Sequence, residues 1–159
     1  MRKRHIGFDL IEHDSPDSLP EADRILLSEA GAAQALAYSP YSDYPVGAAI
    51  RLTDGSIVRG CNQENASFPA GLCAERVAVF QAGVRFPGIA LEVLAVRVRA
   101  GDNSRPAAPC GNCRQSLLEF ELRQGRPMRI LMQSGHGPVY ECGSVSALLP
   151  LGFGPDSLM

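Results

Sequence analysis

The sequence predicts one three-layer α/β/α domain built around a mixed sheet of roughly five strands. The length of 159 residues suits a single domain. A composition of 45% hydrophobic and 20% charged residues is typical of a globular chain with an ordinary core. Helical and strand-like patterns also alternate along the chain, which favours helices on both faces of one sheet.

The chain opens with a charged N-terminal extension, residues 1–20, in which the short apolar run Ile6–Ile11 is the one candidate strand. We expect a single domain over residues 21–159. Its first helix is predicted from Glu21 to about Tyr38, where apolar residues recur at helical spacing. Pro40 ends this helix, because the residue before a proline is disfavoured in the helical region.

A β-hairpin and a second helix follow. Val46–Leu52 and Ile57–Cys61 flank Asp54-Gly55, and an Asp-Gly pair between two apolar runs is a strong hairpin signal. The second helix is predicted over Cys73–Ala82. Gly83 is expected to end it as a C-cap.

The rest of the chain alternates strands with one further long helix. Leu91–Val98 is rich in valine and predicts a strand, and residues 101–109 have the composition of a loop. The remaining predicted elements are a helix over Cys110–Arg123 closed by Gly125, short strands over Met128–Met132 and Pro138–Cys142, and a short helix in the tail.

The charge balance and the N-terminus limit the class of partner and the compartment. Fifteen basic and seventeen acidic residues give a formal charge of −2, whereas nucleic-acid binders usually carry a basic excess. No apolar run approaches the length of a membrane span. The basic start of the chain is followed by an apolar run that Asp9 already breaks, so it does not suit a signal peptide. We therefore expect a cytoplasmic protein with neither nucleic acid nor a membrane as its partner.

Five cysteines, an odd count, suit thiolate chemistry better than a disulfide scaffold. Cys73 stands at one predicted helix start, and Cys110 and Cys113 stand at another. The spacing of three between the second pair puts both sulfurs on one face of the first turn, and Cys73 could approach from its own helix. Three thiolates with an open fourth position are typical of catalytic zinc. The sequence therefore predicts one Zn²⁺ per chain.

Two charged residues beside Cys73 suit this centre. Three thiolates around Zn²⁺ leave one negative charge in excess, and Arg76 is placed to donate to a ligand sulfur and offset it. Glu75 is too close in sequence to Cys73 to be a comfortable fourth ligand. It is the candidate general acid and base, which takes a proton from the attacking water and delivers it to the substrate.

Other interpretations of these residues remain open. A CxxC pair in a cytosolic α/β protein can be a redox dithiol. A structural four-cysteine zinc site could use Cys61 or Cys142. If the zinc takes only the other three cysteines, we expect Cys61 and Cys142, both at predicted strand ends, to be buried as small hydrophobic residues. Glu75 and Arg76 could simply form a solvated helix start.

The same residues carry a resemblance to a known family. An acid two residues after one ligand, followed later by Pro-Cys-x-x-Cys, is the signature of zinc nucleobase deaminases. Over about residues 22–157 the chain resembles the small three-cysteine cytidine deaminases. The matching segments are Tyr38–Ser42, Val46–Ala49, Gly60–Ser67, Cys73–Arg76, Pro109–Gln115, Leu148–Pro150 and Phe153–Pro155.

The resemblance implies a hydrolase of pyrimidine salvage that converts cytidine and 2′-deoxycytidine to the uridines plus ammonia. It implies a homotetramer whose active sites borrow residues from neighbouring subunits. In this family Asn62 and Glu64 match the ribose-binding pair, Tyr44 lines the pyrimidine pocket, and backbone groups around Ala74 fix the base edge. Phe153 matches an aromatic residue that packs on the substrate across a subunit boundary.

The chain departs from the family pattern near the rim of the pocket. Phe68 stands where tyrosine is common, residues 69–72 replace a frequent Gly-Leu-Thr-Ile type of stretch, and Ala108 stands where serine or threonine is frequent. These departures bear on substrate preference. Deamination of a cytosine antibiotic such as blasticidin S is one alternative, and a non-catalytic, zinc-stabilised oligomer that binds nucleosides is another.

Overall fold

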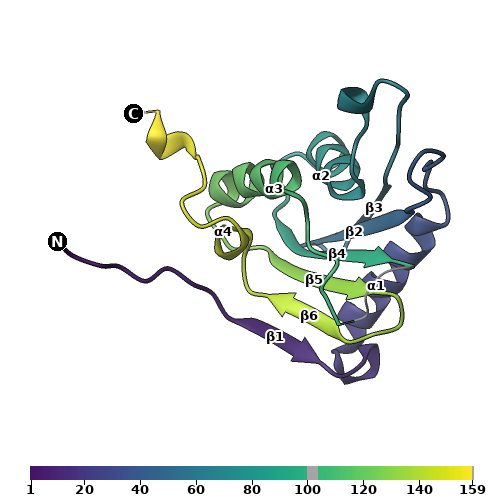
Figure 1. Ribbon diagram of the computed structural model, residues 1–159, viewed down its shortest axis with the longest axis horizontal. Helices are drawn as coiled ribbons and strands as arrows, with labels where there is room; N and C mark the ends of the chain where they lie inside the picture. Colours follow the sequence, from purple (N-terminus) through teal and green to yellow (C-terminus); the bar gives the residue numbers. More distant parts are fainter. Residues whose placement is uncertain (100–103, 159) are drawn as a thin grey trace.

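The computed structural model describes residues 1–99 and 104–158, so part of the loop expected over residues 101–109 lies outside the described residues. A six-stranded sheet carries helices on both of its faces (Figure 1). The strands are β1 (Leu10–His13), β2 (Val46–Leu52), β3 (Ile57–Cys61), β4 (Leu91–Val98), β5 (Arg129–Ser134) and β6 (Val139–Cys142). The α-helices are α1 (Glu21–Gln34), α2 (Ala74–Arg85), α3 (Gly111–Gln124) and α4 (Val145–Leu148). Short 3₁₀ turns lie at Pro16–Ser18, Phe68–Ala70 and Pro155–Ser157.

The sheet is mixed, as the sequence predicted, with the strand order β1-β6-β5-β4-β2-β3. β4 and β5 run parallel, and the other neighbours are antiparallel. The expected number of five strands was wrong, because β1 adds a sixth strand by pairing with β6. The candidate strand Ile6–Ile11 was also placed too early. Leu10 pairs with Cys142, the last residue of β6, so the residues before Leu10 have no neighbouring strand among residues 1–99 and 104–158.

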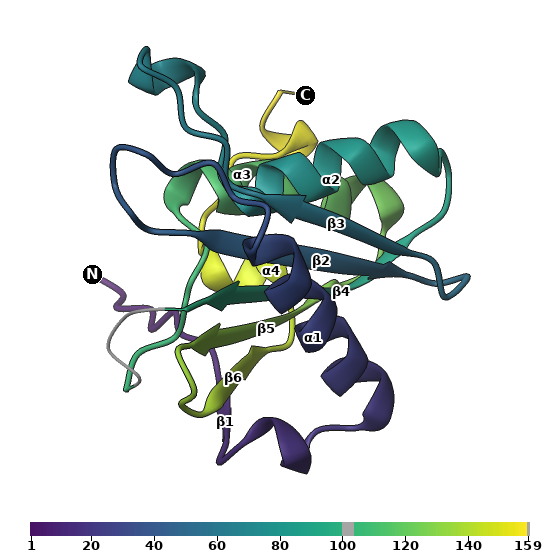
Figure 2. The same cartoon turned by 90° about the vertical axis from the view of Figure 1, so that its right-hand side faces the viewer.

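The helices form the outer layers. α1 lies on one face of the sheet, while α2, α3 and α4 lie on the other, which is clear when Figures 1 and 2 are compared. One core therefore forms under α1, where Leu26 and Ala30 pack with Ala95 of the sheet. A larger core forms on the opposite face, where Leu117 of α3 packs with Leu94. No helix in the described ranges is long and apolar enough to cross a bilayer.

Two glycines let α1 and α2 approach the hairpin closely. A Cβ on Gly47 of β2 would lie 1.9 Å from the carbonyl oxygen of Ala30 in α1. A Cβ on Gly60 of β3 would lie 2.5 Å from the carbonyl oxygen of Ala74, the first residue of α2. The hairpin thus fixes the start of α2 against β3, and Cys73 immediately precedes that start.

Two predicted helix ends differ from the structure. α1 ends at Gln34, before Tyr38, because the Tyr38 N–H donates to the Asn62 carbonyl and so joins the loop after β3. α2 continues through Gly83 to Arg85. A Cβ on Gly83 would lie 2.9 Å from the ring of Phe120 in α3, so this glycine permits helix packing and does not end the helix.

A buried carboxylate joins α3 to the segments that follow it. Glu121 is 5% exposed and accepts hydrogen bonds from the backbone N–H groups of Met128, Val145 and Ser146 at 2.8–2.9 Å. Met128 immediately precedes β5, and Val145 and Ser146 begin α4, where the first N–H groups of a helix have no partner within the helix. Glu121 therefore satisfies donors that burial would otherwise leave unpaired.

An ion-pair network ties β1 to the body of the domain. His13 lies 2.9 Å from Glu141 of β6, and the Arg129 guanidinium donates to both Glu141 and Asp23 at 2.7 Å. Burial opposes ionisation of Glu141, but the hydrogen bonds from Arg129 and His13 outweigh it and hold its pKa below the ordinary value. The carboxylate form of Glu141 therefore stabilises the folded state.

Candidate metal centre and substrate cavity

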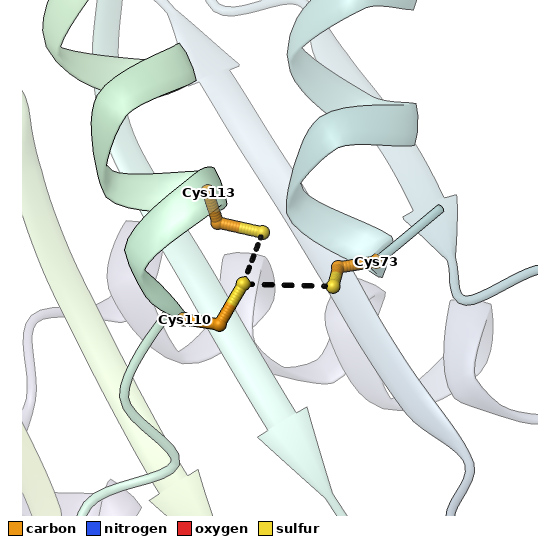
Figure 3. A group of neighbouring side chains, drawn as sticks. All are labelled: Cys73, Cys110 and Cys113. Atoms are coloured by element: carbon orange, nitrogen blue, oxygen red, sulfur yellow. Dashed lines mark hydrogen bonds between the residues drawn. The ribbon is translucent and has the colours of Figure 1, made fainter. Parts of the chain in front are cut away.

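Three cysteine thiols from two helix starts face one another (Figure 3). Cys73 is the N-cap of α2, Cys110 is the N-cap of α3, and Cys113 lies in the first turn of α3. The Cys110 sulfur is 3.8 Å from that of Cys73 and 3.5 Å from that of Cys113, and all three lie within 4.8 Å of one another. Helices α2 and α3 pack side by side on the same face of the sheet, so their N-termini meet here.

This arrangement fits Zn²⁺. Zinc–sulfur bonds of about 2.3 Å in a tetrahedron require sulfurs about 3.8 Å apart, which is close to the separations found here. Cys61 and Cys142 lie outside the group, so the three-thiol centre has no fourth cysteine among the described residues. Cys73 and Cys110 line a cavity, whereas Cys113 is buried behind them. The donor set therefore suits three protein ligands and an open position toward the cavity.

The thiols of the cluster influence one another's ionisation. Hydrogen bonding with Cys113, then with Cys110 and Arg76, outweighs burial and lowers the pKa of Cys73 to about 5. Hydrogen bonding with Cys73 and burial raise the pKa of Cys113. Cys73, at the positive end of the α2 dipole, is therefore the more acidic of these two thiols.

Glu75 lies one residue inside α2 and is only 4% exposed, yet it contributes to the wall of the cavity. Burial, reinforced by the charge of Cys73, raises its pKa. It is not a member of the three-thiol group. Glu75 is thus a carboxyl group that can hold a proton beside the metal centre while facing the cavity.

Arg76 follows Glu75 and lies close enough to Cys73 to lower the pKa of that thiol. Its Nη2 donates to the Gly71 carbonyl at 3.2 Å, which fixes the guanidinium beside the segment that leads into α2. Its Nε is buried and has no hydrogen-bond partner within the described part of the chain. A buried donor left unpaired next to the thiols is consistent with a negatively charged metal–thiolate centre as its neighbour.

The loop between β3 and α2 is held in place by backbone pairing. Gln63 and Leu72 exchange two hydrogen bonds of 2.9 Å, so the chain leaves β3 and returns to the start of α2 at nearly the same point. Tyr38 joins this bridge from the end of α1, since its carbonyl accepts from the Glu64 N–H at 2.9 Å. Asn62 and Glu64 are thereby held beside Cys73.

The side chains of Asn62 and Glu64 order the segment before β2. Asn62 accepts from the Val46 N–H at 2.8 Å and donates to the Tyr44 carbonyl at 3.0 Å. Glu64 accepts hydrogen bonds from the Ser42 hydroxyl and from the backbone N–H groups of Tyr41 and Ser42. The hydrogen bond from Ser42 is the main cause that holds the pKa of Glu64 below its ordinary value, so it is an anion at neutral pH.

A cavity of about 610 Å³ contains most of the predicted site residues. Tyr44, Asn62, Glu64, Cys73, Glu75 and Cys110 all line it. Ala74 is buried behind them. Phe153 does not line the cavity of its own chain, because the Gln115 amide donates to its carbonyl at 2.8 Å and fixes this part of the tail beside α3. Phe153 is 58% exposed.

Comparison with known proteins agrees with this site. The family model for the cytidine and deoxycytidylate deaminase zinc-binding region matches residues 20–125. The chain belongs to this deaminase family. It is 39% identical over 136 residues to cytidine deaminase from Sporosarcina psychrophila, an alignment that covers 84% of this chain and 92% of that protein. It is 38% identical to cytidine deaminase from Halalkalibacterium halodurans, over 85% of this chain and 96% of that protein.

Solved deaminase structures share the fold. The crystal structure of cytidine deaminase from Burkholderia pseudomallei aligns with a TM-score of 0.73 at 36% identity, over 85% of this chain and all of that chain. The structure from Mycobacterium tuberculosis aligns with a TM-score of 0.62 at 37% identity, over 82% of this chain and 95% of that chain. These relatives support the α/β fold and the assignment of the chain to a zinc-binding deaminase family.

Several residues that line the cavity of this deaminase-family chain were not selected from the sequence. Ser42, Val98, Arg105 and Ser134 are the clearest examples. Val98 and Ser134 are the last residues of β4 and β5 and lie opposite each other in register. Since α/β sheets bind ligands at the carboxyl ends of parallel strands, the predicted end of Leu91–Val98 could have identified Val98. Ser134 could not be found in this way, because the predicted strand Met128–Met132 stops before it, whereas β5 extends to Ser134.

The two cysteines outside the centre differ in their surroundings. Cys142 is fully buried at the end of β6, as expected for a small hydrophobic residue. Cys61 is only half-buried, and its sulfur accepts from the Gln63 amide at 3.2 Å. The prediction of burial was therefore right for Cys142 and wrong for Cys61, because Cys61 ends an edge strand that no further strand covers in the described chain.

Proposed function

We propose that the chain catalyses the hydrolytic deamination of cytidine and 2′-deoxycytidine to uridine and 2′-deoxyuridine, with release of ammonia. The observation that carries this proposal is the position of the buried Glu75 carboxyl beside three convergent thiols, at the wall of a cavity large enough for a nucleoside. The relatives named cytidine deaminase, at 38–39% identity over nearly their full length, support the same reaction.

Cys73, Cys110 and Cys113 would hold one zinc ion per chain. When bound there, zinc supplies a Lewis acid that makes a water molecule a better nucleophile at neutral pH. The charge of Arg76 and the N-terminal dipoles of α2 and α3 stabilise the thiolates in this centre.

Glu75 moves the protons of the reaction. Its carboxylate accepts a proton from the attacking water while the oxygen of that water bonds to C4 of cytosine, and it delivers the proton to N3. It then transfers the second proton of the water to the amine, and the bond between C4 and N4 breaks to release ammonia. Burial raises the pKa of Glu75 and thus favours the protonated state that the second half of the reaction needs.

Asn62 and Glu64 suit recognition of the sugar. A carboxylate accepts hydrogen bonds from ribose hydroxyls, and an amide can donate or accept beside it. Glu64 is an anion that already accepts from the Ser42 hydroxyl, so it can accept from a substrate hydroxyl as well. The Tyr44 ring lines the same cavity and suits packing against the pyrimidine, and backbone groups around Ala74 suit the polar edge of the base.

The assembly and cellular setting are further parts of the proposal. We infer a homotetramer in which Phe153 of one subunit packs on the substrate of another, which its exposure and its distance from the cavity of its own chain support. Residues 21–159 form the deaminase domain, and residues 1–20 are an extension to it. Free thiolates suit the reducing cytoplasm, where the activity would serve pyrimidine salvage.

An ultraviolet assay on the purified protein tests this function. Cytidine, 2′-deoxycytidine and blasticidin S are offered separately, with ammonia release measured in parallel, before and after removal of zinc with a chelator. We expect turnover of both nucleosides, loss of turnover on chelation and recovery when zinc is restored. Turnover of blasticidin S alone would redirect the proposal to an antibiotic deaminase, and tight nucleoside binding without ammonia release would contradict catalysis.

A further inference from the structure

β1 and the segment before it carry a row of exposed apolar side chains. β1 is the last strand of the sheet, and in the described ranges only β6 pairs with it. Residues 1–9 continue it as an extended arm that runs beyond the edge of the domain (Figure 1). Ile6, Phe8 and Leu10 are 55%, 48% and 41% exposed. An edge strand with apolar side chains is a template for pairing with another chain.

These side chains share one face of the arm. Leu10 lies opposite Cys142 in register, on the face of the sheet that α4 covers. Because side chains alternate along an extended strand, Phe8 and Ile6 continue that face. Asp9 and Gly7 then belong to the other face. Over residues 6–10 apolar side chains therefore alternate with Gly7 and Asp9 at the period of a strand, while Ile11, which is 53% exposed, lies on the other face.

We propose that β1 and its arm pair edge to edge with the same segment of a second copy of this chain, antiparallel about a two-fold axis, with Phe8 opposite Phe8. A two-fold interface brings the same patch of both copies together, so the segment must be complementary to its own reverse. The sequence around Phe8 has this property.

The register follows from the side chains. With Phe8 at the centre, each Ile6 lies opposite a Leu10, and each Arg4 lies opposite a Glu12. Each interface then has three apolar cross-strand pairs and two pairs of opposite charge, both of which stabilise antiparallel strands. All of these residues lie on the same face of the paired strands.

The neighbouring registers are poorer. With the centre moved to Asp9, two carboxylates face each other, and Ile6 lies opposite Glu12. With the centre moved to Gly7, the Arg4 guanidinium lies opposite Leu10. Lys3 then also lies opposite Ile11, so two cations face apolar side chains, although Arg2 lies opposite Glu12. Like charges directly opposite one another destabilise a strand pair, and neither alternative combines three apolar pairs with the Arg4–Glu12 pairs.

The charge distribution favours another copy of the chain as the partner. Residues 1–5 contain three of the 15 basic residues and none of the 17 acidic residues. The rest of the chain has 12 basic and 17 acidic residues, a formal charge of −5. A basic arm on an acidic body is attracted to the body of a second copy. The family match begins at residue 20, so this contact would be additional to any interface of the family domain.

Cysteine cross-linking tests the pairing and its register. Directly opposite residues in antiparallel strands have Cα atoms about 4.5–5.5 Å apart, within the range of a disulfide. We expect zinc-loaded Phe8→Cys protein, oxidised mildly at low micromolar concentration, to form at least about tenfold more covalent dimer than the matched Gly7→Cys control or the parent protein. Position 7 lies opposite position 9 in this register, so two cysteines at position 7 are too far apart.

A mixing experiment tests the same register independently. An equilibrated mixture of Ile6→Cys protein and a larger tagged Leu10→Cys protein should give mainly the mixed dimer on a non-reducing gel. Cross-linking of Phe8→Cys no greater than that of Gly7→Cys would overturn the pairing, as would equal amounts of all possible dimers in the mixture. Deamination per chain should be unchanged in all of these variants, because the arm does not line the cavity.

Discussion

The sulfur of Cys73 lies 3.8 Å from the sulfur of Cys110, although 37 positions separate the two residues and each begins a different helix. The close approach of α2 to β3 at Gly60 and the packing of α2 beside α3 bring these helix starts together. The metal centre thus depends on a helix–strand contact and a helix–helix contact as well as on the cysteines.

Replacement of Cys110 by alanine should remove zinc from the protein. Cys110 contacts both of the other thiols, so its loss leaves two protein ligands in a site that needs three. Zinc content measured by mass spectrometry should fall below about a tenth of the parent value, and turnover should fall with it. Cys61→Ala is the matched control, since Cys61 lies outside the cluster and its loss should leave zinc in place. Full zinc content in Cys110→Ala would contradict the ligand assignment.

Replacement of Glu75 by glutamine should separate metal binding from proton transfer. The amide fills the same buried volume but cannot accept the proton of the attacking water, so kcat should fall by a factor of about 10²–10⁴. Zinc content should stay at the parent level, because Glu75 is not part of the thiol group. Glu119→Gln, at an exposed glutamate of α3, should change neither quantity. Cytidine turnover near the parent rate in Glu75→Gln would refute the assigned role.

Local signals in the sequence were sufficient for the elements that frame the site. The bounds of β2 and β3 agree with those predicted. The Asp54-Gly55 turn lies between the two strands and fixes their register, so the pairing depends only on neighbouring residues. The starts of α2 and α3 lie within one residue of those predicted from the cysteine motifs. The three thiols predicted to lie together do so.

Features that depend on distant partners could not be predicted in this way. The sixth strand forms because β1 finds β6 more than 120 positions away, and no local pattern encodes that pairing. Gly83 has the local appearance of a helix end. It lies inside α2, where the lack of a side chain leaves room for the ring of Phe120 in α3. Arg105 and Ser134 line the cavity because the loop before α3 lies against the end of β5, where the Ser134 hydroxyl donates to the Arg105 carbonyl.

Asn62 and Glu64 should respond differently to mutation. The Asn62 side chain joins two backbone groups before β2, so Asn62→Ala should lower the free energy of unfolding by about 1–3 kcal/mol and also raise KM. The hydrogen bonds that Glu64 accepts from Tyr41 and Ser42 are exposed to solvent, so Glu64→Gln should raise KM with little loss of stability. Urea unfolding and steady-state kinetics on cytidine check both variants. Equal loss of unfolding free energy in the two variants would contradict the stabilising role that we assign to Asn62 and not to Glu64.

Replacement of Gly60 by alanine should disturb the metal centre from a distance. The new Cβ would lie 2.5 Å from the Ala74 carbonyl oxygen and 2.5 Å from the Ala78 nitrogen, both of which belong to the backbone of α2. The helix must move away from β3, so we expect destabilisation of about 1–3 kcal/mol or more and weaker zinc binding. Gly143→Ala is the control, because a Cβ there meets nothing within 4 Å. Thermal unfolding and competition with a zinc chelator measure the two effects, and a fully stable Gly60→Ala protein would contradict the close packing.

The stabilising effect of Glu141 should depend on pH. Its folded-state pKa lies below the ordinary value of 4.5, so its contribution is complete above about pH 4.5 and is lost as the pH falls through the folded-state pKa. Glu141→Gln should therefore lower the free energy of unfolding by about 1 kcal/mol at pH 7, since the hydrogen bonds from Arg129 and His13 then lose their anionic acceptor. The difference from the parent should shrink toward zero in acid. Urea unfolding at pH 7 and at about pH 3, with Glu119→Gln as the exposed control, measures it; a difference that grows in acid would show that the carboxylate destabilises the fold.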